Sequence, residues 1–165
     1  LTEVAFHEGP LCRGKRLPKL VERRDLKGDL HVHTLASDGR SSMKDMVKAA
    51  GEHGLKYIAI AEHSQTLSIT GGLDPSRLMK QIEEIDRLNE EINGVTILKS
   101  IEVEILRDGR LDLPDDILEK LDLVVGSVHS NFSLSEEKQT ARILRARSVG
   151  RESIFTILIA FGSFL

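Results

Sequence analysis

The stretch Asp29-Leu30-His31-Val32-His33-Thr34 carries two histidines separated by one residue. Side chains alternate along an extended strand, so His31 and His33 leave the same face and can bind one metal ion together. Two histidines at this spacing also occur by chance or within a hydrogen-bonded polar patch. The stretch by itself therefore predicts half of a metal site.

Three further candidate ligands follow apolar runs. Short runs rich in β-branched residues are typical of buried parallel strands. In each case the candidate ligand stands at the carboxyl end of the run, which is where β/α proteins build their sites. The runs and their ligands are 57–61 with His63, 95–101 with Glu102 and 123–128 with His129.

Helical patterns separate these runs. A Ser42-x-x-Asp45 capping box precedes the first pattern, Asp74-Pro75 begins the second, and Ser133-x-x-Glu136 precedes the third. Alternating strands and helices predict an α/β fold with a β/α sheet or barrel. The apolar residues at helical spacing are Met43, Met46, Val47 and Ala50 in the first pattern and Leu78, Ile82, Ile85, Leu88 and Ile92 in the second, and the third carries Ile143 and Leu144.

The candidate ligands are expected to converge, because every strand of such a fold delivers residues to the same rim. Asp38, in the loop 35–40 after the first strand, would join them. Imidazole nitrogens and carboxylate oxygens without cysteine suit Zn²⁺, Mn²⁺ or Fe²⁺, and neighbouring metals of this kind favour hydrolysis of phosphate esters. The candidate metal ligands are His31, His33, Asp38, His63, Glu102 and His129.

Several ordered motifs resemble the PHP (polymerase and histidinol phosphatase) domain. The form at the carboxyl end of bacterial and archaeal family X DNA polymerases is the one that they resemble most. The similarity spans about residues 16–146 and includes the connector 16–28. The motifs are Gly28-Asp-Leu-His-Val-His-Thr34, Ser37-Asp-Gly39, Ala61-Glu-His-Ser64, Ile101-Glu-Val-Glu104 and Ser127-Val-His-Ser130.

This resemblance implies a fold and a role for each ligand. The family folds as a distorted seven-stranded β/α barrel, similar to a TIM barrel, that binds three metals. This chain would hold the first four to five β/α units. The implied metal sets are His31, His33 and Glu102 for the first metal, Glu102 as a bridge with His129 for the second, and Asp38 with His63 for the third. The implied catalytic residues are His31, His33, Glu102 and His129.

The resemblance also implies an activity. A complete domain of the polymerase type would act on DNA 3′ ends as a metal-dependent 3′→5′ exonuclease or 3′ phosphatase, beside a polymerase domain upstream. The histidinol phosphatase branch suggests small phosphate esters as an alternative substrate. A non-catalytic fragment that binds metal weakly or needs a partner is the third alternative.

The end of the sequence departs from the family. Members continue to a His-Pro motif and an Asp-x-His motif, whereas this sequence has no histidine after His129, no aspartate after Asp122 and no proline after Pro114. Each metal would then lack one family ligand, and we expect impaired activity. The expected organisation is a connector over 1–27, the amino-terminal part of a PHP domain over 28–146 and a divergent apolar tail over 147–165.

The apolar tail leaves three alternatives open. Its uncharged stretch, 153–165, has 13 residues, whereas a membrane-spanning helix needs about 20. A buried fifth strand over 154–161 and a premature or frame-shifted end are the other two interpretations. No signal peptide or membrane span is recognisable.

Composition adds less. A net charge of −3 argues against a globally basic nucleic-acid binder, although the basic residues between 13 and 24 could meet a DNA backbone or form a solvated linker. The single cysteine, Cys12, excludes an intrachain disulfide and fits a reducing cytoplasm.

Other residues have ordinary structural interpretations. His53 before Gly54 is typical of a helix end, and His7 is expected to be exposed. Glu104 could support the ligands or lie in solvent, and the orienting role of Glu62, where the family often has aspartate, stays open. Turns are expected at Gly71-Gly72 and Asp108-Gly109.

Overall fold

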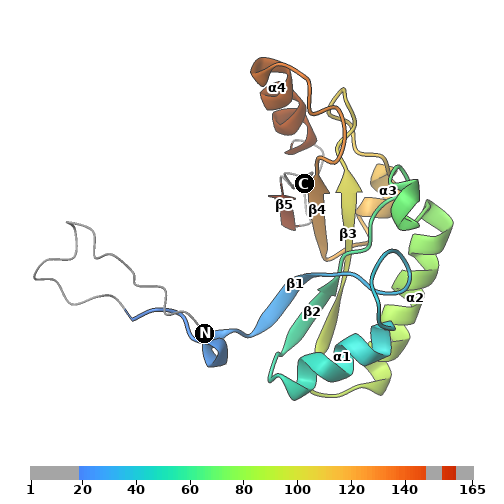
Figure 1. Cartoon of the computed structure of the whole chain (residues 1–165). Helices are drawn as coiled ribbons and strands as arrows, with labels where there is room; N and C mark the ends of the chain where they lie inside the picture. Colours follow the sequence, from blue (N-terminus) through green and yellow to red (C-terminus); the bar gives the residue numbers. More distant parts are fainter. Residues whose placement is uncertain (1–18, 148–153, 159–165) are drawn as a thin grey trace, which may run out of the picture.

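Strands and helices alternate along the chain (Figure 1). The computed structural model describes residues 19–147 and 154–158. The elements are the 3₁₀ turns η2 (Arg23–Asp25) and η3 (Ser68–Thr70), the strands β1 (Gly28–Val32), β2 (Tyr57–Ile60), β3 (Thr96–Glu104), β4 (Leu123–Ser127) and β5 (Ile154–Leu158), and the helices α1 (Met43–Glu52), α2 (Pro75–Glu91), α3 (Asp115–Leu118) and α4 (Glu136–Arg147).

The described strands form one parallel sheet in the order β1-β2-β3-β4-β5, so each strand pairs with the next one in the sequence. Parallel neighbours need crossover connections, which here run through the helices. Figure 1 shows a curled sheet with α1, α2 and α3 along one side. The arrangement is part of a TIM-like barrel wall, as the sequence predicts, and it aligns the carboxyl ends of the strands.

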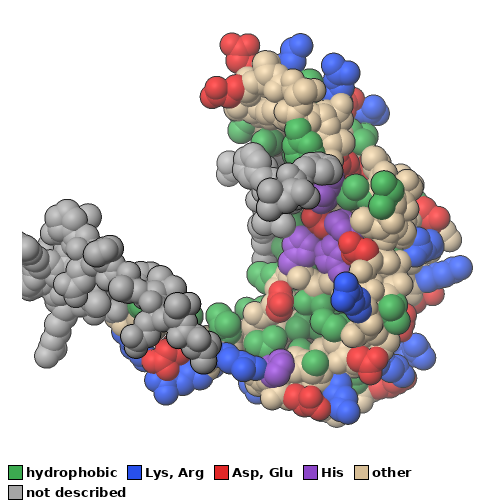
Figure 2. Space-filling model, in the orientation of Figure 1, with side chains coloured by type: hydrophobic (Ala, Val, Ile, Leu, Met, Phe, Trp, Pro, Cys, Tyr) green, Lys and Arg blue, Asp and Glu red, His purple; other side chains and the backbone are tan. Residues whose placement is uncertain are grey.

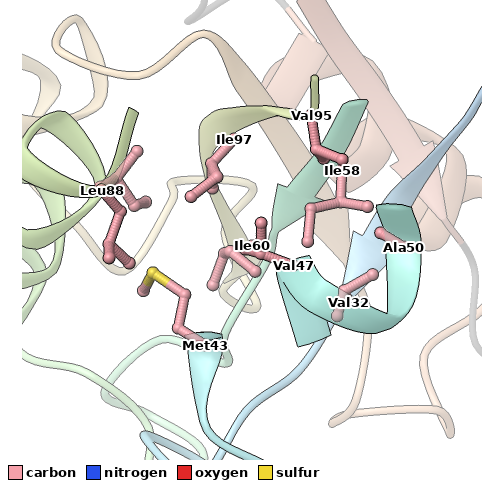
Figure 3. Close-up of a cluster of buried hydrophobic side chains, with 10 residues drawn as sticks. Val32, Met43, Val47, Ala50, Ile58, Ile60, Leu88, Val95 and Ile97 are labelled. Atoms are coloured by element: carbon pink, nitrogen blue, oxygen red, sulfur yellow. The ribbon is translucent and has the colours of Figure 1, made fainter. Parts of the chain in front are cut away.

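Two apolar clusters attach the helices to the sheet. In the first, Val47 of α1 and Leu88 of α2 pack with Ile58 and Ile60 of β2 (Figure 3). In the second, Leu78 and Ile82 of α2 pack with Ile101 and Val103 of β3 and with residues around α3. The buried positions of α1 and α2 follow the predicted spacing of three and four residues.

The predicted helix starts are confirmed for α1 and α2. Ser42 Oγ accepts from the backbone N–H of Asp45, and Asp74 accepts from the backbone N–H of Arg77 ahead of Pro75. These side chains satisfy backbone donors that have no partner within the helix.

The helix predicted after Ser133-x-x-Glu136 is present as α4. It begins at Glu136 directly after Ser135, whose carbonyl accepts from Gln139 N at 2.9 Å. Leu144 is 59% exposed. The buried positions are Arg142 and Ala146, because Arg142 forms hydrogen bonds beneath the helix. The short helix α3 carried no recognisable periodic signal.

The carboxyl-terminal tail includes a strand. β5 pairs in parallel with β4, from Leu123 with Ile154 to Ser127 with Leu158, which agrees with the strand alternative for 154–161. The expected connector up to residue 18 and the tail segments 148–153 and 159–165 lie outside the described residues. None of the helices in the described part of the chain combines the length and apolar character needed to cross a membrane.

Candidate metal centre

The predicted ligands meet at the carboxyl ends of the strands. Histidine side chains gather there beside carboxylates in Figure 2. β1 and its continuation supply two histidines, and the loop after β1 supplies the aspartate. Glu102 lies on β3, whereas His63 follows the end of β2 and His129 follows the end of β4. Parallel pairing continues past β2 through a bridge between His63 and Glu102. All six predicted ligands belong to groups whose donor atoms lie within 4.8 Å of one another: His31, His33, Asp38, His63, Glu102 and His129.

Glu102 is the centre of this arrangement. Its Oε2 lies 3.3 Å from Nε2 of both His31 and His33 and 2.9 Å from Nδ1 of His63. Its Oε1 lies 3.2 Å from Nε2 of His129. Burial raises the pKa of Glu102, but the close contacts with His129 and with the other three imidazoles outweigh burial and hold that pKa far below its ordinary value. The carboxylate is therefore charged and shared by four imidazoles.

The donors form three overlapping groups. They are His31, His33 and Glu102; His33, Asp38 and His63; and His63, Glu102 and His129. The first group is the set that the resemblance implies for one metal. The second group contains the implied pair Asp38 and His63 together with His33, which also belongs to the first group. The third group contains the implied pair Glu102 and His129 together with His63, which also belongs to the second group.

The geometry of β1 suits a shared cation. The rings of His31 and His33 are stacked with centroids 5.0 Å apart, and their Nε2 atoms are 2.9 Å apart. Two ligands of one zinc ion, each about 2.0–2.1 Å from it, lie roughly 3 Å apart. His63 Nδ1 is buried and makes no hydrogen bond despite its short contact with Glu102. The residues present therefore fit a divalent metal.

The loop after β1 is held by Glu62. This carboxylate is fully buried and accepts from the backbone N–H of Thr34 at 2.9 Å, from the Thr34 hydroxyl and from the Ser37 hydroxyl. The same loop carries Asp38, whose carboxylate lies 2.8 Å from His33 Nδ1 and 3.3 Å from His63 Nε2. Glu62 thus orients the loop that delivers a candidate ligand.

Arg77 holds the same loop from α2. Its guanidinium donates to the carbonyl of Ala36 at 2.6 Å and to the carbonyls of Gly71 and Gly72. Gly71 adopts a left-handed conformation with φ of 71°, as the expected turn requires.

The pKa values of the loop pair move in opposite directions. Burial lowers the pKa of His33, but hydrogen bonds with Glu102 and Asp38 outweigh it and raise the pKa. Burial raises the pKa of Asp38, but the hydrogen bond with His33 and the nearby charge of His63 outweigh it and lower the pKa. Both directions favour the charged forms, so the donors attract one another in the absence of a cation.

Glu104 supports His129. The carboxylate is fully buried, so the alternative of solvent exposure is wrong. Its Oε2 accepts from the backbone N–H of His129 at 3.0 Å and contacts Nδ1 at 2.9 Å, and its Oε1 accepts from the Ser130 hydroxyl at 2.6 Å. A proton on Nδ1 leaves the Nε2 lone pair directed toward the metal centre. In the absence of a cation, hydrogen bonds with Glu102 and Glu104 raise the pKa of His129 to about 9, and a metal would replace the proton on Nε2.

Arg142 completes this support and was missed by sequence reasoning. Its guanidinium lies 3.4 Å from Glu104 and donates to the carbonyls of Leu106 and Ser130, each at 2.9 Å, and of Ile105. The side chain is 2% exposed. No periodic pattern in the sequence predicts that Arg142 is buried, because its partners lie up to 38 residues away.

His53 belongs to none of the donor groups in the described part of the chain. His53 is the C-cap residue of α1, and its Nδ1 lies 2.7 Å from the guanidinium of Arg23. Its predicted capping role is confirmed. His7 lies outside the described residues.

A sequence profile described as the PHP domain matches residues 29–157. The chain belongs to the PHP domain family. The resemblance of the ordered motifs to this family is thereby confirmed.

Named relatives share part of their length with this PHP chain. It is 45% identical over 118 residues to "DNA polymerase/3'-5' exonuclease PolX" of Bacillus subtilis (strain 168), covering 72% of this chain and 21% of that protein. It is 35% identical over 123 residues to "Probable phosphatase TTE1963" of Caldanaerobacter subterraneus subsp. tengcongensis, covering 72% and 46%. A probable phosphatase of Thermoanaerobacter sp. (strain X514) is 34% identical over 123 residues, covering 72% and 48%. The chain spans about a fifth to a half of these relatives.

Proposed function

We propose that this PHP chain is a metal-dependent phosphoesterase. The observation that carries the proposal is the position of Glu102, a buried carboxylate that contacts four imidazoles and joins two of the three donor groups. A carboxylate between cations reduces their repulsion and sets their spacing. Metals bound here would polarise a phosphoryl group and acidify water, which is the chemistry that hydrolysis of a phosphate ester needs.

The side chains have distinct roles in this proposal. His31, His33 and Glu102 would hold one cation, Glu102 would share a second with His129, and Asp38 with His63 would hold a third. Glu104 keeps the proton of His129 on Nδ1, so that Nε2 remains a donor to metal. Glu62 and Arg77 hold the loop that carries Asp38.

The substrate that we propose is a DNA 3′ end. Support comes from the relative named DNA polymerase/3'-5' exonuclease PolX. By this proposal, 28–146 is the amino-terminal part of a PHP domain, acts as a 3′→5′ exonuclease or 3′ phosphatase, and accompanies a polymerase domain in a cytoplasmic repair protein. The alternative is a small phosphomonoester, favoured by the relatives named as probable phosphatases.

Hydrolysis of matched substrates tests the proposal. The chain, supplied with Mn²⁺ or Zn²⁺, is incubated with a 3′-phosphorylated oligonucleotide, a 3′-hydroxyl oligonucleotide and histidinol phosphate, and products are quantified. Glu102→Gln should abolish hydrolysis, whereas Glu83→Gln, an exposed change on α2, should retain it. Equal rates in Glu102→Gln and the unaltered chain would refute the proposal. Absence of hydrolysis with metal bound would favour a non-catalytic metal-binding fragment.

A further inference from the structure

A basic groove lies beside the metal centre. It encloses about 780 Å³ between the hairpin around Asp108-Gly109, the loop after His129 and α4. Its exposed cationic side chains are Arg107, Arg110, Lys138 and Arg145. Among the described lining residues, Asp108 is the one carboxylate, and it pairs with Arg110 at 2.7 Å. The groove therefore keeps an excess of positive charge.

The walls of the groove are held in place before any ligand binds. Buried Arg142 donates from α4 to the carbonyl of Leu106 on the hairpin and to the carbonyl of Ser130 beyond β4. Gly109, with φ of 83°, packs so closely on α4 that a Cβ atom would lie 2.8 Å from the carbonyl oxygen of Arg142. Asn131 holds a left-handed conformation, and its carbonyl accepts from the side chain of Gln139. A preformed site loses less entropy when a ligand binds.

The groove adjoins the candidate metal centre at Ser130, the residue that follows the candidate ligand His129. Ser130 lines the groove, and its hydroxyl donates to Glu104, the carboxylate that contacts His129. An anion held at Ser130 would therefore lie next to the His129 side of the donor groups. The groove is thus placed to hold the part of a substrate that is not being hydrolysed.

We propose that this groove binds the phosphate backbone of a single-stranded nucleic acid and directs its end to the metal centre. Cations on two walls match a repeating chain of phosphates, whereas a small phosphomonoester needs only the metal centre. Phe132, beside Asn131 of the groove lining, is 47% exposed. Cationic grooves with exposed aromatic rings are typical of single-strand binding, because bases stack on the rings. This inference names the substrate class of the proposed phosphoesterase and rests on that function.

Fluorescence anisotropy tests the groove without turnover. The full chain is titrated into labelled oligothymidylate in EDTA at several salt concentrations. Arg107→Glu with Lys138→Glu should weaken binding about tenfold and reduce the salt slope by roughly 1.4, the value for two lost phosphate contacts on a single strand. Arg87→Glu with Lys120→Glu, the same charge change at exposed positions that do not line the groove, should weaken binding far less. Equal effects of the two pairs would overturn the proposal.

Stacking and hydrolysis give two further tests. Phe132→Ala should weaken oligothymidylate binding about fivefold or more without changing the salt slope, whereas Leu144→Ala, another exposed apolar residue of this region, should not. Unchanged binding in Phe132→Ala, or equal competition by polyglutamate, would show a site for anions in general and would refute the strand assignment. Hydrolysis of p-nitrophenyl phosphate, measured separately, reports on the phosphoesterase and should be unaffected by the groove variants. If the chain does not hydrolyse p-nitrophenyl phosphate, the phosphoesterase proposal fails, and the anisotropy measurements still decide whether the groove binds single strands.

Discussion

Replacing Glu104 with glutamine tests how the fold supports His129. The carboxylate contacts two donors of His129 through Oε2 and contacts Ser130 and Arg142 through Oε1. Every partner atom is a donor in the present arrangement. In glutamine an NH₂ group replaces one of the two accepting oxygens. In one orientation this NH₂ group faces the donors of His129, and in the other it faces the donors of Ser130 and Arg142.

The energetic cost follows from burial. Glu104 is fully buried and Arg142 is 2% exposed, and removing one charge of a buried pair costs about 3–5 kcal/mol. A domain is stable by only about 5–15 kcal/mol. Glu104→Gln should therefore lower the free energy of unfolding by about 3–5 kcal/mol, whereas Glu83→Gln, exposed on α2, should change it by less than about 0.5 kcal/mol.

Urea denaturation followed by circular dichroism measures this difference. Both variants and the unaltered chain are unfolded in EDTA, so that metal binding does not contribute to stability. Stability is compared from the midpoint with a common slope. A loss below about 1 kcal/mol in Glu104→Gln would show that the buried pair is not the support inferred from the contacts.

Four further outcomes are expected. Glu102→Gln should remove phosphoesterase activity, whereas His53→Ala should change only helix stability, by about 0.3–1 kcal/mol; equal activity losses would argue against the central role of Glu102. The 165-residue chain should retain at most one zinc ion per chain after dialysis, measured by elemental analysis, because the donor groups contain two carboxylates against three dications; three retained ions would contradict this. Glu62→Gln should weaken zinc binding about 10- to 100-fold in competition titrations with a chelator, because one of the two oxygens that accept from Thr34 and Ser37 becomes an NH₂ group; unchanged affinity would remove Glu62 from the site. Leu88→Ala, fully buried in the first cluster, should lower the unfolding free energy by about 2–5 kcal/mol in thermal denaturation, and a smaller loss would mean that the cluster collapses around the gap.

The sequence alone determines most of the strands, the helices α1 and α2 and the identity of the candidate ligands. Periodicity is a local property, so Leu78 and Ile82 identify the buried face of α2 without knowledge of its neighbours. The alternation at His31 and His33 likewise follows from strand geometry. Because parallel strands end at one rim, the convergence of ligands from four strands could also be anticipated.

Only the tertiary structure decides which side chains support those ligands and which groups share them. Glu104 and Arg142 are 38 residues apart, and Glu62 and Thr34 are 28 apart. No local pattern predicts such pairs, because burial and direction arise only when α4 and the loop after β1 pack on the sheet. The same packing made Leu144 exposed and Arg142 buried, since the guanidinium found carbonyls on two other segments. Whether a polar side chain is buried depends on hydrogen-bond partners that are distant in the sequence. Whether an apolar side chain is buried can be predicted from the face of its own helix or strand.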